Sequence, residues 1–337
     1  MIYNTLDKDI FLLEGKLSFN IIGTGRALPK KCVTNDMLAS FLDTSDEWIY
    51  TRTGIKERRI LTDESLLDLA YECSLAALEN AGVAAEELDL IIFSTLQGDY
   101  ISPSLCCLLS KRLGAVCGRQ LDINMGCSGF IYALDIADSY FRADKAQKVL
   151  VVCAEAMSRI SDWTDRSTCV LFGDGAGAVV LEKGDGFKAI NLTVDGAYED
   201  LYVPIPQGNC PYSPHSDEEG FLKMNGQDIY IFAVSAVVRE INAILEQEGI
   251  TPDEPDYYIL HQANTRIIDS ARKKLKQPAE KFPVNLDRFG NTSSATIPIM
   301  LDELNRAGKL KNGGKLIFCS FGAGLTTGVC AIEWTKQ

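Results

Sequence analysis

A cysteine stands between a short apolar strand and an apolar helix in this chain. Cys127 lies in the segment 124–130, after a strand expected over 120–124 and before a helix expected over 130–141. Glycines on both sides of it permit a sharp turn and the close approach of a ligand. Free N–H groups and the macrodipole at a helix start stabilise a thiolate. The pattern favours a nucleophile, and a small buried thiol is the alternative.

A general base for this cysteine is easy to search for, because the chain has only two histidines. His215 lies in a proline-punctuated loop and is expected to be solvated. His261 follows an apolar strand over 255–260 and precedes a helix over 265–275. A polar residue at the end of a strand stands where α/β folds place their ligands. His261 is therefore the candidate base, with a hydrogen-bonded structural histidine as the alternative.

A third polar position has the same placement. Gly290 and Asn291 precede an apolar helical stretch over 295–304. Taken alone, this pair indicates an ordinary turn. Cys127, His261 and Asn291 nevertheless occupy three similar loop positions, and a thiol, an imidazole and an amide donor suit acyl transfer through a thioester.

The composition limits the classes of function. The chain has 337 residues, is 46% hydrophobic and has a net charge of −13, which argues against nucleic acid as a partner. Its apolar runs are too short to span a membrane, and its N-terminus lacks the apolar core of a secretory signal. The eleven cysteines are scattered and include no Cys-x-x-Cys pair, so a disulfide framework or a zinc site is not expected. A reducing cytoplasm is the expected location.

Although its net charge is negative, the chain contains one cluster of basic residues. Its five cations follow His261 on the expected helix, and helical spacing places Arg266, Lys273 and Lys276 on one face. A solvated helix face is one interpretation, and a dock for an acidic partner beside the site is the other. The cluster comprises Arg266, Arg272, Lys273, Lys274 and Lys276.

The chain repeats itself loosely, which predicts two α/β halves. The strand over 148–154 and the segment 169–181 resemble 315–320 and 321–332, and 88–94 resembles 255–261. Alternating strands and helices indicate layered sheets covered by helices. The halves are expected to cover residues 18–185, with the nucleophile, and 186–337, with the histidine and asparagine, after an N-terminal extension over 1–17.

Two glycine-rich segments need separate interpretation. The run 173–177 leads into a strand over 179–181 and has the wrong spacing for a dinucleotide fingerprint, so it predicts a close-packed turn. Gly322 and Gly324 form a second such segment, whose backbone N–H groups could face a ligand.

Taken together, these motifs resemble a β-ketoacyl-acyl-carrier-protein synthase III, the initiating condensing enzyme of type II fatty acid synthesis. The resemblance covers about residues 19–334. It implies an α/β thiolase fold, with two pseudo-symmetric halves in five layers, α-β-α-β-α, and a homodimer. The motifs that carry it are the segments 21–25, 43–49, 51–55, 126–130, 172–177, 261–264 and 290–293.

The resemblance also implies roles for individual residues. Cys127 matches the acylated nucleophile, and His261 and Asn291 match the pair that supports decarboxylation. The backbone N–H groups of Cys127 and Ala323 match the oxyanion hole. The positions implied for coenzyme A are Thr44, Trp48, Arg52, Arg166 and Asn264, those for the acyl pocket are Ser102 and Phe172, and the dock for the acidic carrier is the basic cluster.

The implied reaction needs no metal or redox cofactor. An acyl-CoA acylates Cys127, malonyl-acyl carrier protein loses CO2, and the resulting carbanion attacks the acyl-cysteine to give a 3-ketoacyl-carrier product. Ser102 stands where a bulky phenylalanine often limits the pocket from the partner subunit, so a longer, branched or unusual primer is expected. Further departures are the extension over 1–17 and Gly126 in place of the usual alanine.

Three other functions remain open from the sequence. A degradative thiolase would need a second catalytic cysteine, for which Cys319 and Cys330 are poorly placed. A specialised-metabolism synthase or acyltransferase would keep Cys127 and His261 and use another carrier. A catalytically silent carrier-binding protein would form no acyl-cysteine, which the Cys, His and Asn set disfavours.

Overall fold

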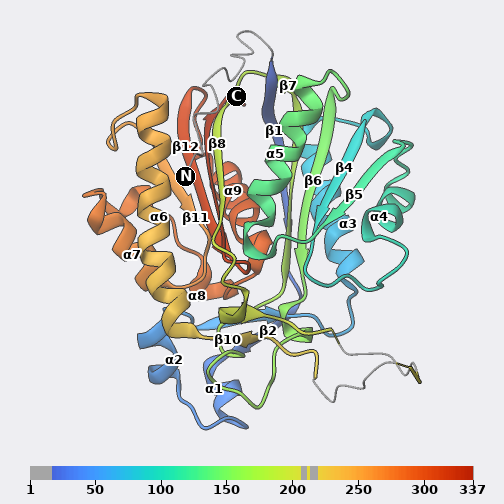
Figure 1. Cartoon of the computed structure of the whole chain (residues 1–337). Helices are drawn as coiled ribbons and strands as arrows, with labels where there is room; N and C mark the ends of the chain where they lie inside the picture. Colours follow the sequence, from blue (N-terminus) through green and yellow to red (C-terminus); the bar gives the residue numbers. More distant parts are fainter. Residues whose placement is uncertain (1–16, 206–210, 213–218, 337) are drawn as a thin grey trace.

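The computed structural model in Figure 1 describes residues 17–205, 211–212 and 219–336. His215 and residues 1–16 of the expected extension lie outside these ranges. Within the ranges, no helix combines the length and the apolar character that a membrane crossing requires.

The first sheet has five strands in the order β1-β7-β6-β4-β5. Strand β4, which lies between β6 and β5, runs parallel to both of them, whereas β7 is antiparallel to β6 and to β1. The strands are β1 (Ser18–Ala27), β4 (Leu90–Ser94), β5 (Arg119–Ile123), β6 (Lys148–Glu155) and β7 (Gly175–Gly184).

The second sheet repeats this design with four strands in the order β11-β12-β13-β8. Here one pair, β11 and β12, is parallel, as β4 and β6 are in the first sheet, and the other two pairs are antiparallel. Strands β4, β6, β7 and β1 therefore correspond to β11, β12, β13 and β8, which is the repeat that the sequence predicted. The strands are β8 (Phe187–Val194), β11 (Tyr257–Leu260), β12 (Gly314–Gly322) and β13 (Thr326–Trp334).

Helices form three layers around these sheets (Figure 1). The central helices α5 (Gly129–Arg142) and α9 (Thr296–Arg306) pack between the sheets in one apolar cluster that includes Phe130 and Phe318. Helices α3 (Leu66–Ala81) and α4 (Leu105–Leu113) cover the first sheet, and α6 (Gly226–Glu248) and α7 (Thr265–Lys274) cover the second. This is the five-layered thiolase arrangement that the sequence predicted.

The prediction of a turn over 173–177 was wrong, because β7 already begins at Gly175. Helix α9 crosses this strand so closely that a Cβ on Gly177 would lie 2.8 Å from the backbone nitrogen of Ile299. The glycines therefore serve close helix-sheet packing inside a strand, where no side chain fits.

Short elements surround the opening of the site. Arg58, fully buried, donates from Nη1 to Asn35 Oδ1 (2.8 Å) and from Nη2 to the carbonyl of Val170 (2.8 Å), which fixes β3 to a loop beside the cavity. These elements are α1 (Asn35–Ala39), α2 (Asp46–Thr53), α8 (Leu286–Phe289), and the strand pairs β2 (Lys31–Thr34) with β3 (Glu57–Ile60) and β9 (Leu201–Tyr202) with β10 (Lys223–Met224).

Candidate active site

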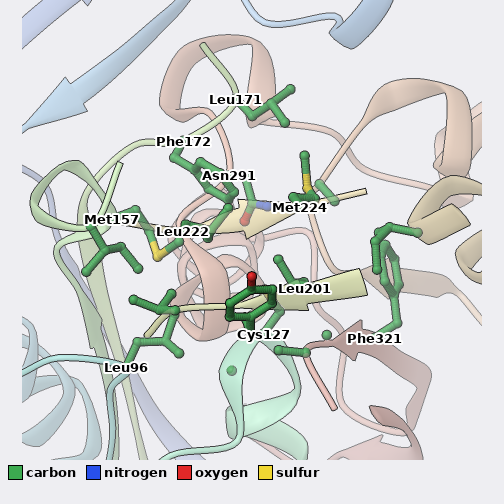
Figure 2. Close-up of a pocket in the computed structure, with 18 of the residues that line it drawn as sticks. Leu96, Cys127, Met157, Leu171, Phe172, Leu201, Leu222, Met224, Asn291 and Phe321 are labelled. Carbon is green, nitrogen blue, oxygen red and sulfur yellow. The ribbon is translucent and has the colours of Figure 1, made fainter. Parts of the chain in front are cut away.

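A cavity of about 1340 Å³ connects the surface beside α2 and α7 with the interior between the two halves. Cys127, His261 and Asn291 all line it, so the structure brings together the three residues that the sequence singled out. Figure 2 shows Cys127 where the chain enters α5, with Asn291 across the cavity and apolar side chains around both.

Cys127 sits in a 3₁₀ turn, Gly126–Ser128, directly before α5. Gly126 has a φ of 51°, in the left-handed region that favours glycine. The end of β12 lies against the turn, since a Cβ on Gly322 would be 2.9 Å from the Cys127 nitrogen. A Cβ on Gly126 would in turn be 3.5 Å from the nitrogen of Ala323. Both backbone nitrogens of the expected oxyanion hole thus border this turn.

The electrostatics of the thiol differ from the expectation of a stabilised thiolate. Burial raises the pKa of Cys127 to about 12, which outweighs the hydroxyl of Ser293, a group that favours the ionised sulfur. The negative charge of Glu155 also raises this pKa. At neutral pH the sulfur is therefore protonated before substrate binds, and a base must take its proton.

His261 follows β11 and is 2% exposed. Its Nδ1 lies 2.8 Å from Thr296 Oγ1, and its ring packs edge-on against Phe321 with 5.2 Å between centroids. Burial lowers the pKa of His261 to about 3, so the imidazole is neutral at physiological pH. A neutral imidazole can accept a proton with one ring nitrogen and donate one with the other.

Asn291 is held by its backbone and by its own side chain. Its N–H donates to the carbonyl of Leu171 (2.9 Å), and its carbonyl accepts from the N–H of Gly173 (3.1 Å). Its Oδ1 accepts from the N–H of Ser293 at 2.8 Å. This bond fixes the orientation of the amide, so the Nδ2 amino group is the part that can donate to a ligand.

The sequence did not predict a hydrogen bond that joins the two halves of the fold next to the site, between Glu155 and Ser294. Glu155, at the end of β6, accepts from Ser294 Oγ (2.5 Å) and from the N–H of Leu96 (2.9 Å). The preceding residue, Ser293, is fully buried with a φ of 50°, an uncommon conformation for a residue other than glycine. Glutamate at a strand end carries no sequence signal for such a contact, because its partner is 139 residues away.

The expected coenzyme A residues divide into two groups. Trp48, Arg52 and Asn264 line the mouth of the cavity. The guanidinium groups of Arg52 and Arg166 lie 4.6 Å and 5.1 Å from the Trp48 ring centroid. Arg166 and Thr44 are not among the described residues that line the cavity.

Asn264 connects two helices at the mouth of the cavity. Its Oδ1 caps α7 by accepting from the N–H of Arg266 (2.9 Å), and its Nδ2 donates to the carbonyl of Arg52 (3.0 Å). Both polar atoms of this amide already have partners, so the structure gives it a positioning role between α7 and α2.

The basic cluster differs in one respect from its expected geometry. Helix α7 ends at Lys274, so Lys276 lies beyond the helix, with a φ of 54°. Arg266 lines the cavity mouth and donates to the carbonyl of Thr51 (2.8 Å), while Arg272 pairs with Asp269 (3.3 Å). Lys273, Lys274 and Lys276 are exposed.

Beyond Cys127 the cavity is apolar, which the sequence did not reveal. Phe172 lies there, as expected, but the remaining residues come from five separate segments with no common motif. Ser102 is exposed and does not line the cavity of its own chain within the described residues. The apolar residues are Leu96, Met157, Ile160, Leu171, Phe172, Leu201, Val203, Leu222 and Met224.

Two further observations bear on other chemistries. Cys319 and Cys330 are buried in β12 and β13, where burial raises the pKa of both thiols, and they do not line the cavity. In the part of the chain that the structure describes, no group of three His, Cys, Asp or Glu side chains could hold a metal ion.

Comparison with known proteins places these features in a family. Residues 121–196 match the model of the 3-oxoacyl-[acyl-carrier-protein] synthase III family, and residues 245–334 match the model of its C-terminal part. The β-ketoacyl-[acyl-carrier-protein] synthase III of Clostridium acetobutylicum is 44% identical over 325 residues, which cover 95% of this chain and 99% of that protein.

Solved structures agree with this match. The 3-oxoacyl-[acyl-carrier-protein] synthase III of Aquifex aeolicus superposes with a TM-score of 0.87 at 44% identity, covering 94% of this chain and 99% of that chain. The priming β-ketosynthase of the R1128 polyketide pathway has a TM-score of 0.88 at 33% identity, covering 95% and 97%.

Proposed function

This chain belongs to the β-ketoacyl-[acyl-carrier-protein] synthase III family, and from that membership we infer that it is the acyltransferase that initiates fatty acid synthesis. It condenses an acyl-CoA primer with malonyl-acyl carrier protein and releases CO2. The specialised-metabolism alternative is less well supported, since the polyketide relative is 33% identical and the fatty acid relatives reach 44%.

We propose that acylation begins with proton transfer from Cys127 to His261. The S–H bond breaks as Sγ attacks the thioester carbonyl, and Nε2 of the neutral imidazole takes the proton. The backbone N–H groups of Cys127 and Ala323 donate to the developing oxyanion, where one such donor is typically worth about 10²–10³ in rate. The C–S bond to coenzyme A then breaks, and its sulfur receives the proton.

In the second half-reaction Asn291 has the leading role. The malonyl carboxylate leaves as CO2, and its electron pair forms a thioester enolate. Nδ2 of Asn291 donates to the enolate oxygen, together with His261 when Nε2 carries a proton. The carbanion attacks the acyl carbonyl on Cys127, and the C–S bond to the cysteine breaks to give the 3-ketoacyl carrier product and a Cys127 thiolate. A proton from solvent then restores the thiol.

The single observation that carries this proposal is the shared cavity of Cys127, His261 and Asn291, contributed by both halves of the fold. Intact-protein mass spectrometry after incubation with acyl-CoA tests it. We expect one added acyl group on the native protein and none on Cys127→Ala. The buried Cys319→Ala variant serves as the matched control and should still become acylated.

For the primer, we propose an acyl chain longer than acetyl. The apolar wall beyond Cys127, with Met157, Leu222 and Met224, supports this, because each further buried methylene of an acyl chain adds about 0.8 kcal/mol of binding there. Competition between acyl-CoAs of increasing length, read by the added mass, identifies the primer. Strict preference for acetyl-CoA would contradict the proposal.

For the carrier, we propose docking on Arg266, Arg272, Lys273, Lys274 and Lys276. Arg266 lines the cavity mouth and the other four follow it along α7 and just beyond, in a chain whose net charge is −13, so they offer an acidic partner a local positive surface. Lys273→Glu should raise the KM for malonyl-carrier protein and leave acylation by acyl-CoA unchanged. Lys145→Glu, the same change at another exposed lysine, should alter neither.

At the mouth we propose that coenzyme A binds through Trp48 and Arg52, with its adenine entering between Trp48 and Arg166. The contact between this arginine and the indole supports an aromatic-cationic slot. Thr44 and Asn264 border the same segment. The reaction needs no resident cofactor, and we propose that it takes place in the cytoplasm.

A further inference from the structure

Thr296 contacts the Nδ1 side of the His261 ring and has no part in the chemistry described so far. Thr296 is the first residue of α9 and is 2% exposed. Its Oγ1 lies 2.8 Å from Nδ1 of His261 and 3.0 Å from the carbonyl oxygen of Ser293. The contact joins the imidazole to the 3₁₀ turn Ser293–Ala295, which follows Asn291.

The hydroxyl of Thr296 has one proton to donate, and the group that receives it determines which nitrogen of His261 carries a lone pair. A threonine hydroxyl has one proton and two lone pairs. When that proton is donated to the carbonyl of Ser293, which can only accept, the hydroxyl is left to accept from Nδ1–H. A neutral imidazole with its proton on Nδ1 has a lone pair on Nε2. That nitrogen is then able to take a proton from Cys127.

We infer that Thr296 is a positioning residue that holds His261 in the tautomer with the proton on Nδ1, and so prepares Nε2 as the base for acylation of Cys127. This inference rests on the proposed function. It extends that function because it separates the two half-reactions: a base is needed for acylation, whereas a hydrogen-bond donor is needed at the enolate.

Removing the hydroxyl should therefore affect the half-reactions unequally. In Thr296→Val the methyl group offers no acceptor, so a proton on the buried Nδ1 has no partner and moves to Nε2. With its proton on Nε2, the ring becomes a hydrogen-bond donor toward the site but is a poor base. Acylation of Cys127 should slow by about 10²-fold, the usual size of a general-base contribution. Decarboxylation should stay within a few-fold of its original rate.

Nuclear magnetic resonance can read the tautomer directly, because the chain has only two histidines. His215→Gln leaves one imidazole, and ¹⁵N-histidine labelling then reports His261 alone. We expect the Nδ1–H pattern in this background, the Nε2–H pattern after Thr296→Val, and recovery of the first pattern in Thr296→Ser, which restores a hydroxyl.

The kinetic part uses two assays on the full chain. Acyl-cysteine formation is followed by mass spectrometry, and decarboxylation of malonyl-carrier protein is followed in a Cys127→Ala background with and without Thr296→Val. Slowed acylation with intact decarboxylation and a changed tautomer supports the inference. Equal loss of both, or an unchanged tautomer, overturns it.

These outcomes are distinguishable from a failure of the proposed function. If the native protein formed no acyl-cysteine, the condensing reaction would be wrong, while the NMR comparison would still decide the tautomer. Thr296→Ser also separates the hydroxyl from packing, because it should restore acylation although it lacks the methyl group.

Discussion

The reactivity of Cys127 depends on its neighbours, because burial raises the pKa of the thiol to about 12. A thiol that stays protonated until substrate binds is protected from oxidation and alkylation, since the thiolate is the reactive form. In the proposed mechanism, the neutral His261 and the oriented amide of Asn291 act in different half-reactions. Substitutions at these positions should therefore separate acylation from condensation.

Asn291→Asp should impair condensation selectively. An aspartate still accepts from the N–H of Ser293, so the loop is kept, but its carboxylate cannot donate and repels an enolate. We expect decarboxylation to fall by about 10²-fold or more, as for loss of an oxyanion donor. CO2 release and acyl-cysteine formation measure the two half-reactions. An equal loss in both would contradict a specific role in the second.

Glu155 should make the stability of the protein depend on pH. Burial raises the pKa of this carboxyl to about 7, from its usual 4.5. The folded state therefore binds the proton more tightly than the unfolded state, so this contribution is fully present below pH 4.5 and is lost as pH rises through 7. A shift of this size corresponds to about 3 kcal/mol.

Glu155→Gln provides the test, because a glutamine does not titrate. Between pH 4.5 and 7 the free energy of unfolding of the native protein should decrease relative to that of the variant, as measured by urea denaturation. Parallel stability curves for the two proteins would show that Glu155 has an ordinary pKa.

Among the elements, β7 contains glycines because α9 packs closely against it, although glycine is not typical of a strand. In Gly177→Ala the new Cβ would meet backbone atoms of Ile299 and Pro298 at 2.8–3.0 Å. Overpacking of this kind typically costs about 1–3 kcal/mol. Gly118→Ala is the matched control, because a Cβ there has nothing within 4 Å. We expect a lower Tm for the first variant and little change for the second.

The elements also show what could be predicted from the sequence. Cys127, His261 and Asn291 were singled out because each stands on a loop that leads into a helical stretch, which is a local pattern. Thr296, Ser293 and Glu155 have no such pattern, since their contacts join segments that are far apart in the chain. The start of β7 was misplaced for the same reason: glycine has low strand propensity, and only the presence of α9 explains it.

At the scale of the whole molecule, we propose that the loop over 96–104 is a surface through which two copies of the chain associate. Ile101 is fully exposed and Tyr100 is 62% exposed, in the loop between β4 and α4. Exposed apolar residues of this size mark an association surface. We expect light scattering to give a mass of about twice 37.0 kDa. Ile101→Glu should shift the protein toward the monomer, and an unchanged dimer would exclude this loop from the interface.

The two corresponding turns, Gly126–Ser128 and Ser293–Ala295, have consequences for how the catalyst could be controlled. One turn bears Cys127 and the other precedes Thr296, so the proposed mechanism needs both halves of the fold. A wedge-shaped inhibitor that parted the halves by a fraction of an ångström would silence the enzyme without blocking the primer's entrance. Such a compound would be noncompetitive with acyl-CoA, which distinguishes it from any molecule that fills the cavity.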